Sequence, residues 1–247
     1  MAIIAIINQK GGTGKTTTAI NLGSALSSLG KKVLLIDLDP QANLSYSFGI
    51  KSPNGTITEV LQGKKTLQAI LIEKEGLSIT PSSISLADLE ISLVNKIGRE
   101  GLLKERLKGL KGYDYVFIDS PPSLSILTIN ALNAAQEVLI PLQMEILSLQ
   151  GLAQLLDTIK EVRRVLNKNL KIKGIIPSMY DARRRLSDEV LAEIKKFKET
   201  VFKTVIRENV KIAEAPSFAK SVLTYAPSSH GAEDYIKLAK EFIKERG

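Results

Sequence analysis

The stretch "NQKGGTGKTTT", residues 8–18, decides the fold because it joins a short apolar run to a helical pattern. The run "AIIAIIN" at 2–8 predicts a buried strand, and a helix is expected from about Lys15 to Leu29. A glycine-rich turn between a strand and a helix lets backbone N–H groups face an anion. This context favours a phosphate-binding loop over a glycine-rich turn that binds nothing.

The loop departs from the usual pattern G-x-x-x-x-G-K-[ST] in two ways. Gln9 stands where the first glycine is expected, and a second lysine, Lys10, stands five residues before Lys15. In the usual pattern Lys15 reaches the β- and γ-phosphates, and the hydroxyl of Thr16 holds Mg²⁺. The residues expected around the nucleotide phosphates are Lys10, Gly11, Gly12, Thr13, Gly14, Lys15, Thr16 and Thr17.

Strand and helix patterns alternate along the rest of the chain. Further strands are expected at 32–39, 115–119, 137–142, 172–180 and 201–206, with a weaker one at 77–80. Further helices are expected at about 123–135, 148–167, 186–199 and 231–246. This alternation predicts an α/β fold, a mostly parallel twisted sheet flanked by helices, within a single domain over 1–247. Residues 50–112 have the least regular pattern.

Three aspartates follow predicted strands. Asp37 and Asp39 end the strand at 32–39, and Asp119 ends the strand at 115–119. Because ligands of parallel sheets bind at the carboxyl ends of the strands, these carboxylates are expected near the phosphates. Asp119 is the expected Walker B carboxylate near Mg²⁺, and Asp37 is a further metal candidate. The alternative is that these side chains cap nearby helices.

Composition and charge narrow the function classes. The chain has no cysteine, which excludes disulfides, thiolate zinc sites and cysteine-ligated iron–sulfur clusters, and this fits a reducing cytoplasm. No apolar run approaches the roughly 18–20 residues of a spanning helix. The net charge is +8; residues 1–150 hold 14 Lys and Arg against 13 Asp and Glu, so the excess lies in 151–247. A basic surface suggests nucleic acid as a partner, and the alternative is a solvated lysine-rich face.

Five ordered motifs resemble the ParA family of partition ATPases, in the branch that includes Soj and is related to MinD. They are "KGGTGKTTT", "VLLIDLDPQAN", "YDYVFIDSPPSLSILTINAL", "PLQMEILSLQGL" and "EAPSFAKSV", and they span residues 1 to about 225. The resemblance implies a P-loop NTPase of the deviant Walker A type. It also implies the short form of the family, without a helix-turn-helix domain before Met1.

The resemblance implies roles for individual residues. Lys10 matches the signature lysine, which reaches the nucleotide of the partner subunit, and Lys15 matches the phosphate lysine of the same subunit. Asp39 matches the residue that aligns the hydrolytic water. Lys10, Lys15 and Asp39 are therefore the expected catalytic residues, and Thr16, Asp37 and Asp119 the expected metal residues.

The segment "IRENV", 206–210, differs from the family's common "IPRNV". The family places this segment near the adenine, so Asn209 and the backbone at Arg207 are expected base contacts. The family arginine has also been tied to DNA binding. Glu208 replaces that arginine here, and the neighbouring Arg207 is the expected substitute.

The implied activity is ATP hydrolysis with Mg²⁺ by a homodimer that forms on ATP. The dimer is expected to bind double-stranded DNA non-specifically, to associate with the nucleoid in the cytoplasm, and to work with a ParB-like partner in plasmid or chromosome segregation. The expected DNA contacts are Arg183, Arg184, Arg185, Lys195, Lys196, Lys198, Lys203, Arg207, Lys211 and Lys220.

The alternative reading is a MinD-like regulator that binds membranes through a C-terminal amphipathic helix. The end of the chain, "AEDYIKLAKEFIKERG", carries apolar residues at helical spacing together with lysines. Such spacing more often indicates packing on the protein's own core. The lack of cysteine disfavours metal-cluster relatives, and the lack of an [NT]-K-x-D motif disfavours GTPases.

Overall fold

The computed structural model describes residues 1–244, and eight strands within them form one sheet. The strands are β1 (Ala2–Ile6), β2 (Val33–Asp37), β3 (Ile72–Lys74), β4 (Leu77–Thr80), β5 (Tyr115–Asp119), β6 (Glu137–Gln143), β7 (Lys171–Tyr180) and β8 (Ile206–Arg207). Their order is β3-β4-β2-β5-β1-β6-β7-β8, and all pairings are parallel except that of β3 with β4. The expected α/β fold with a mostly parallel sheet is confirmed.

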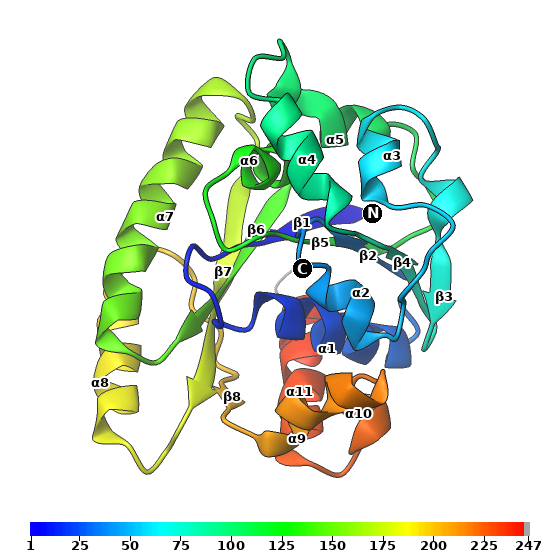
Figure 1. The fold of residues 1–247 in the computed structure, drawn as a ribbon. Coiled ribbons are helices and arrows are strands. Elements are labelled where there is room, and N and C mark those ends of the chain that lie inside the picture. The colour runs from blue at the N-terminus through cyan, green and yellow to red at the C-terminus, as the bar shows by residue number, and fades with distance from the viewer. Residues whose placement is uncertain (245–247) are drawn as a thin grey trace.

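Helices cover both faces of the sheet (Figure 1). The helices are α1 (Lys15–Ser28), α2 (Asn43–Ser47), α3 (Ile57–Leu61), α4 (Ser85–Ser92), α5 (Leu102–Arg106), α6 (Ile126–Ala134), α7 (Ile146–Val165), α8 (Arg185–Ile194), α9 (Val210–Glu214), α10 (Val222–Tyr225) and α11 (His230–Lys244). Three 3₁₀ turns are η1 (Gln68–Ile70), η2 (Arg99–Gly101) and η3 (Ala215–Phe218). Helices α1, α2, α10 and α11 lie below the sheet in Figure 1, and α3 to α6 lie above it.

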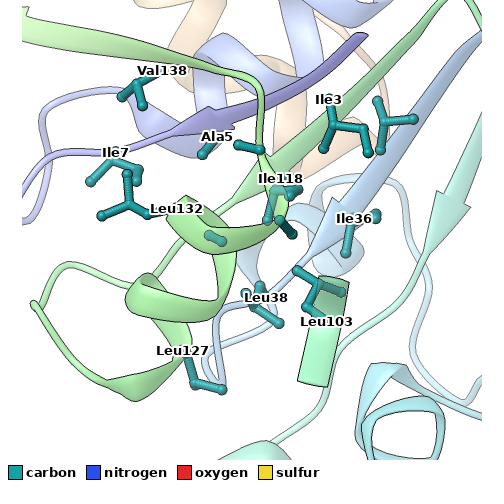
Figure 2. Close-up of a cluster of buried hydrophobic side chains, with 14 of the residues drawn as sticks. Ile3, Ala5, Ile7, Ile36, Leu38, Leu103, Ile118, Leu127, Leu132 and Val138 are labelled. Atoms are coloured by element: carbon teal, nitrogen blue, oxygen red, sulfur yellow. The ribbon is translucent and has the colours of Figure 1, made fainter. Parts of the chain in front are cut away.

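Along each strand, successive side chains point to opposite faces of the sheet, and this divides the core into two layers. Ile3, Ala5 and Ile7 pack with α3 to α8 on one face, where Figure 2 shows them beside residues of the neighbouring strands and of α6. Ile4 and Ile6 point to the other face and pack with α1 and α11. Because both faces are covered, the strands are apolar throughout, as parallel strands usually are.

The last helix packs on the protein's own core. Tyr235, Leu238 and Phe242 of α11 are buried, and the Phe242 ring meets the Tyr115 ring edge-on with centroids 5.4 Å apart. This apolar face is therefore already covered, as the spacing predicted. Among the described residues, no helix has the length and apolar character needed to cross a membrane.

The prediction of a strand at 201–206 is wrong for most of these residues. Val201 forms an isolated bridge with Ile175, and β8 begins only at Ile206. Between them, the backbone N–H groups of Lys203 and Thr204 donate to the Glu241 carboxylate of α11. These N–H groups bind a side chain, so they form no sheet ladder.

The ends of other helices differ from the predicted ends because of caps and turns. The helix expected at 123–135 begins at Ile126, because the Ser125 hydroxyl accepts from the Leu127 N–H as an N-cap. The helix expected at 186–199 ends at Ile194 and is followed by turns. The expected end of the last helix at 246 lies outside the described residues.

A left-handed residue between η3 and α10 gives a testable stability effect. Ala219 is exposed and has φ 56°, a region that costs an L-residue about 1–2 kcal/mol, whereas glycine's greater freedom in the unfolded chain costs about 0.4–1 kcal/mol. Ala219→Gly is expected to raise the free energy of unfolding by roughly 0.5–1 kcal/mol in denaturant titrations. Ser217→Gly, in the preceding turn without positive φ, should lower it; an equal rise in both variants would contradict the explanation.

Candidate active site

The loop between β1 and α1 forms an open cradle. Gly12 has φ 74° and Gly14 has φ 90°, so both lie in the left-handed region that favours glycine. A Cβ at either position would meet no heavy atom within 4 Å, so the backbone conformation, rather than a lack of space, requires glycine. Gly14 caps α1, and its carbonyl accepts from the Thr18 N–H at 2.8 Å. The free N–H groups of the first helical turn therefore face the cavity and can bind an anion.

Lys15 supplies a cation inside this cradle. Its side chain is buried, and Nζ donates to the Lys10 carbonyl oxygen at 3.1 Å. Burial lowers the pKa of Lys15, while the carboxylates of Asp119 and Asp39 act in the opposite direction. A cation held out of water attracts an incoming phosphate more strongly than an exposed one does, and the two nearby carboxylates keep it protonated.

Asp119 ends β5 and is the least satisfied group of the site. The residue is fully buried, and neither carboxylate oxygen forms a hydrogen bond of normal geometry within the described part of the chain, although the Thr16 hydroxyl lies near enough to act on the carboxylate. Burial raises its pKa well above the usual range and Asp37 adds to the rise, while the Thr16 hydroxyl and Lys15 lower it. Unpaired buried oxygens of this kind indicate a ligand that the protein alone does not supply.

The donors around Asp119 fit Mg²⁺. Magnesium is usually held by one or two carboxylates together with phosphate oxygens and water, and Asp119 with the hydroxyl of Thr16 provides that set. Within residues 1–244, no group of three His, Cys, Asp or Glu side chains is arranged to hold a metal by itself. The site therefore matches a metal that arrives with a phosphate ligand.

Asp39 lines the cavity of the phosphate loop, whereas the fully buried Asp119 is not among the lining residues. The side chain of Asp39 is 5% exposed, and Oδ1 accepts from the Gln41 N–H at 2.9 Å in a tight turn. The cavity has a volume of about 390 Å³. It is lined by Gly11, Gly12, Gly14, Lys15, Thr16, Thr17, Asp39, Asn43, Ser47, Pro122 and Met179. The structure thus brings the loop and Asp39 together, as expected from the strand ends.

Asp37 has partners other than those expected for a metal ligand. Its Oδ2 accepts from the N–H and the hydroxyl of Ser45 at 2.9 and 2.6 Å, and its Oδ1 accepts from the Asp39 N–H at 3.2 Å. Burial raises its pKa to about 6, and the hydrogen bonds from Ser45 oppose this rise. Both oxygens are already used, so Asp37 holds α2 and the Asp39 loop rather than facing the cavity.

A second, more apolar cavity of about 490 Å³ continues from the first. It is lined by Gly14, Thr17, Ser178, Met179, Ile206, Arg207, Glu208, Asn209, Val210, Ile212, Ala213, Pro216 and Tyr235. Gly14, Thr17 and Met179 line both cavities. An apolar cavity with few polar groups next to an anion cradle suits a base and its sugar.

Arg207 and Asn209, two polar residues of this second cavity, differ in which of their groups remain free to contact a ligand. The Arg207 guanidinium is bound to the buried Asp234 at 2.6 Å and to Glu233 at 3.2 Å. Asn209 caps α9, with Oδ1 accepting from the Lys211 N–H at 2.9 Å. The amide nitrogen of Asn209 remains available as a donor, whereas Arg207 offers mainly its backbone.

Lys10 points away from its own cavity. Its Nζ donates to Glu145 Oε2 at 2.6 Å and lies 3.5 Å from Gln143 Oε1, at the end of β6. The side chain of Lys10 is 43% exposed and that of Glu145 46%. The motif that contains Gln143 and Glu145 was recognised in the sequence, but no role was predicted for either residue.

The basic residues expected at DNA fall into two groups. Arg183, Arg184, Arg185, Lys196, Arg207 and Lys211 each form an ion pair with an acidic residue of the same chain. Within the described residues, the ammonium groups of Lys195, Lys198, Lys203 and Lys220 have no such pair and are exposed. Glu208 Oε2 lies 3.9 Å from the Arg184 guanidinium. The acid that stands in place of the family's arginine therefore partly neutralises the positive charge of Arg184.

Sequence reasoning missed several residues of the site. Asn43, Ser47 and Met179 line the cavity of the phosphate loop, yet no role was predicted for any of them, although Asn43 ends the motif "VLLIDLDPQAN". Asn43 and Ser47 follow the "DLDPQ" turn closely, so their place on a short helix after an Asp-rich strand end is the signal that could have found them. Met179 has φ 53° at the end of β7, which no sequence pattern indicated.

Comparison with known proteins gives similarity over most of the chain. A family model described as an AAA domain matches residues 1–172. The chromosome-partitioning ATPase Soj of Thermus thermophilus is 46% identical over 97% of this chain and 94% of its own length. The chromosome partitioning protein ParA of Myxococcus xanthus is 45% identical over 98% of this chain and 88% of its own length.

A solved structure shares the whole architecture. Cobyrinic acid a,c-diamide synthase from Mycobacterium smegmatis, with a bound ATP analogue and magnesium, has a TM-score of 0.88 and 36% identity. The match covers 100% of this chain and 96% of that one. Similarity therefore extends beyond the phosphate loop to the elements that form both cavities.

Proposed function

The chain belongs to the family of Soj and ParA chromosome-partitioning ATPases, and on that premise we propose that two copies pair around ATP and bind DNA. The protein is an ATPase that uses ATP and Mg²⁺. In the ATP-bound pair the residues of the site have separate roles in hydrolysis, and separate surfaces contact the second copy and DNA.

The two cavities provide one continuous nucleotide site. The loop N–H groups and Lys15 hold the phosphates, and the cavity at Asn209 holds the adenine. Thr16 and Asp119 would hold Mg²⁺, which would neutralise charge on the phosphate oxygens. Asp39 orients the attacking water, so hydrolysis proceeds by positioning and charge stabilisation.

The position of Lys10 is the observation that supports pairing most directly. Its ammonium lies beside Glu145, is 43% exposed and is not among the residues that line the phosphate cavity of its own chain, which leaves it for the nucleotide of a second copy. Exposed apolar side chains follow at once, with Ile146 63% and Leu147 72% exposed, and Leu124 is 39% exposed after the Asp119 strand. A face that combines an exposed lysine, ion-paired with Glu145 at the rim, and apolar residues suits a second copy of this chain.

The unpaired lysines support a DNA surface. Lys195 and Lys198 follow α8, and Lys203 lies in the next loop. These ammonium groups have no acidic partner in the described chain, so DNA phosphates can pair with them without first breaking an ion pair within the protein. The paired arginines at 183–185 are weaker donors, because each already binds a carboxylate.

DNA binding tests the proposal through its salt dependence. With ATP, affinity for duplexes of unrelated sequence is expected to be similar and to fall steeply with salt, with a slope near −0.9 per contacted phosphate. Changing Lys195, Lys198 and Lys203 together to alanine should reduce affinity at least about tenfold and flatten the slope by about 2 to 3. Fluorescence anisotropy at several salt concentrations measures both.

A matched variant controls for the loss of charge. Changing Lys64, Lys96 and Lys111 to alanine removes three exposed lysines from the region of α3 to α5, and affinity should change less than about twofold. A flat salt dependence in the unaltered chain, or equal losses in the two triple variants, would rule out this DNA surface.

Segregation also requires a partner that ends the DNA-bound state. We propose that a ParB-like centromere-binding protein stimulates hydrolysis, which separates the pair and releases it from the nucleoid. Membrane binding through α11, as in the MinD-like alternative, is disfavoured because the apolar residues of α11 pack against α1 and the sheet.

A further inference from the structure

A chain of buried hydrogen bonds links three segments behind the catalytic loop. Ser45 of α2 donates its hydroxyl to Asp37 Oδ2 at 2.6 Å, and the same hydroxyl oxygen accepts from the Ser82 N–H at 3.0 Å. Asp37 ends β2, and Ser82 follows β4 by two residues. Ser45 is 1% exposed, so water cannot take the place of either bond.

The same chain of bonds reaches the residues that line the phosphate cavity. Asp37 Oδ1 accepts from the Asp39 N–H at 3.2 Å, which fixes the backbone of the residue that orients the water. Helix α2 begins two residues before Ser45, and its Asn43 and Ser47 border the cavity with Asp39. A helix of five residues has little stability of its own, so its position depends on contacts such as these.

Only a hydroxyl can fill the position of Ser45. The group must donate to a buried carboxylate and accept from a backbone N–H at the same time. Alanine would leave the Ser82 N–H unpaired and would leave Asp37 Oδ2 only the bond from the backbone N–H of residue 45, and a buried group without its partner moves to find another or admits water. The segment 38–47 would then lose the fixed geometry on which Asp39 depends.

We infer that Ser45 is a positioning residue for hydrolysis, which holds Asp39 and α2 in place through Asp37 and Ser82. The inference rests on the proposed role of Asp39 and deepens it. Ser45 touches neither the cavity nor the nucleotide, so its loss should affect the chemical step more than nucleotide binding.

Ser45→Ala is expected to lower kcat for ATP hydrolysis about tenfold or more, with the dissociation constant for ATP changed less than about threefold. Without nucleotide, amide hydrogen exchange in 38–47 should become faster. Ser45→Thr, which keeps the hydroxyl, should retain most of kcat and the slow exchange. If Ser45→Ala does not fold, Ser45→Cys, whose thiol is somewhat larger and forms weaker hydrogen bonds, serves in the same comparison.

Ser78→Ala is the matched control, because Ser78 lies on β4 and donates its hydroxyl to Glu73 away from the site. It should change neither kcat nor exchange in 38–47. Unchanged kcat in Ser45→Ala, or a fall in kcat with unchanged exchange, would overturn the inference. The exchange result does not depend on activity, so failure of the proposed Asp39 role would be recognised separately, by hydrolysis that persists without Asp39.

Discussion

Asp39→Ala is expected to lower kcat for ATP hydrolysis by at least about 100-fold while ATP still binds within about threefold of its normal affinity. Lys15, the loop N–H groups and the base cavity are all left intact, so the binding contacts remain. The lost carboxylate is the only acid that lines the phosphate cavity among the described residues. Phosphate release in steady state and a nucleotide titration measure the two quantities.

The same variant should remain paired on ATP, because Lys10 and the apolar rim are unchanged. Size-exclusion chromatography with ATP should show a dimer that persists far longer than that of the unaltered chain. Asp157→Ala is the control, since Asp157 is exposed on α7 and pairs, among residues 1–244, with Lys160 alone. Normal turnover in Asp39→Ala would remove Asp39 from the mechanism.

The phosphate loop and the carboxylates could be predicted because their placement is local. A strand that runs into glycines and then a helix sets Lys15 and Thr16 within a few residues of the strand end. Asp39 and Asp119 follow buried strands that the pattern of apolar residues identifies. Parallel strands bring their carboxyl ends to one edge, so the convergence of these groups follows from the fold class.

The remaining features depend on contacts between distant segments. The second cavity joins Gly14 to residues near 178 and 206–216, and no local pattern indicates that junction. The expected strand at 201–206 fails because Glu241, almost 40 residues away, takes its N–H groups. The antiparallel β3 is short and largely exposed, so it lacks the apolar signal of the inner strands.

Asp37 illustrates how one sequence pattern serves two purposes. Asp37 and Asp39 lie on the same strand end, and spacing alone does not separate a site carboxylate from a structural one. The structure separates them by partners: Asp37 is bound by Ser45, whereas Asp39 retains access to the cavity. The N–H and the hydroxyl of Ser45 together occupy Asp37, and Asp39 is the aspartate that lines the cavity.

Lys10→Ala is expected to leave ATP binding nearly normal and to reduce both pairing and hydrolysis, the latter by roughly 10³-fold, as for other trans-acting cations. Lys10 lies 2.6 Å from Glu145 at the rim and contributes only its carbonyl oxygen to Lys15, a group that alanine keeps. Turnover and size-exclusion chromatography with ATP measure the effects. Lys64→Ala, which removes an exposed lysine far from the rim, should have neither effect.

Mixing two inactive variants tests whether Lys10 acts across the interface. A pair formed from Lys10→Ala and Asp39→Ala subunits contains one complete site, in which Asp39 of the first subunit meets Lys10 of the second. Random pairing would therefore restore up to about a quarter of normal turnover. A lysine that acts within its own subunit would give no recovery, because neither variant then holds a complete site. Mixtures without recovery, although mixed pairs form, would contradict the trans role and leave Lys10 to stabilise only its own loop.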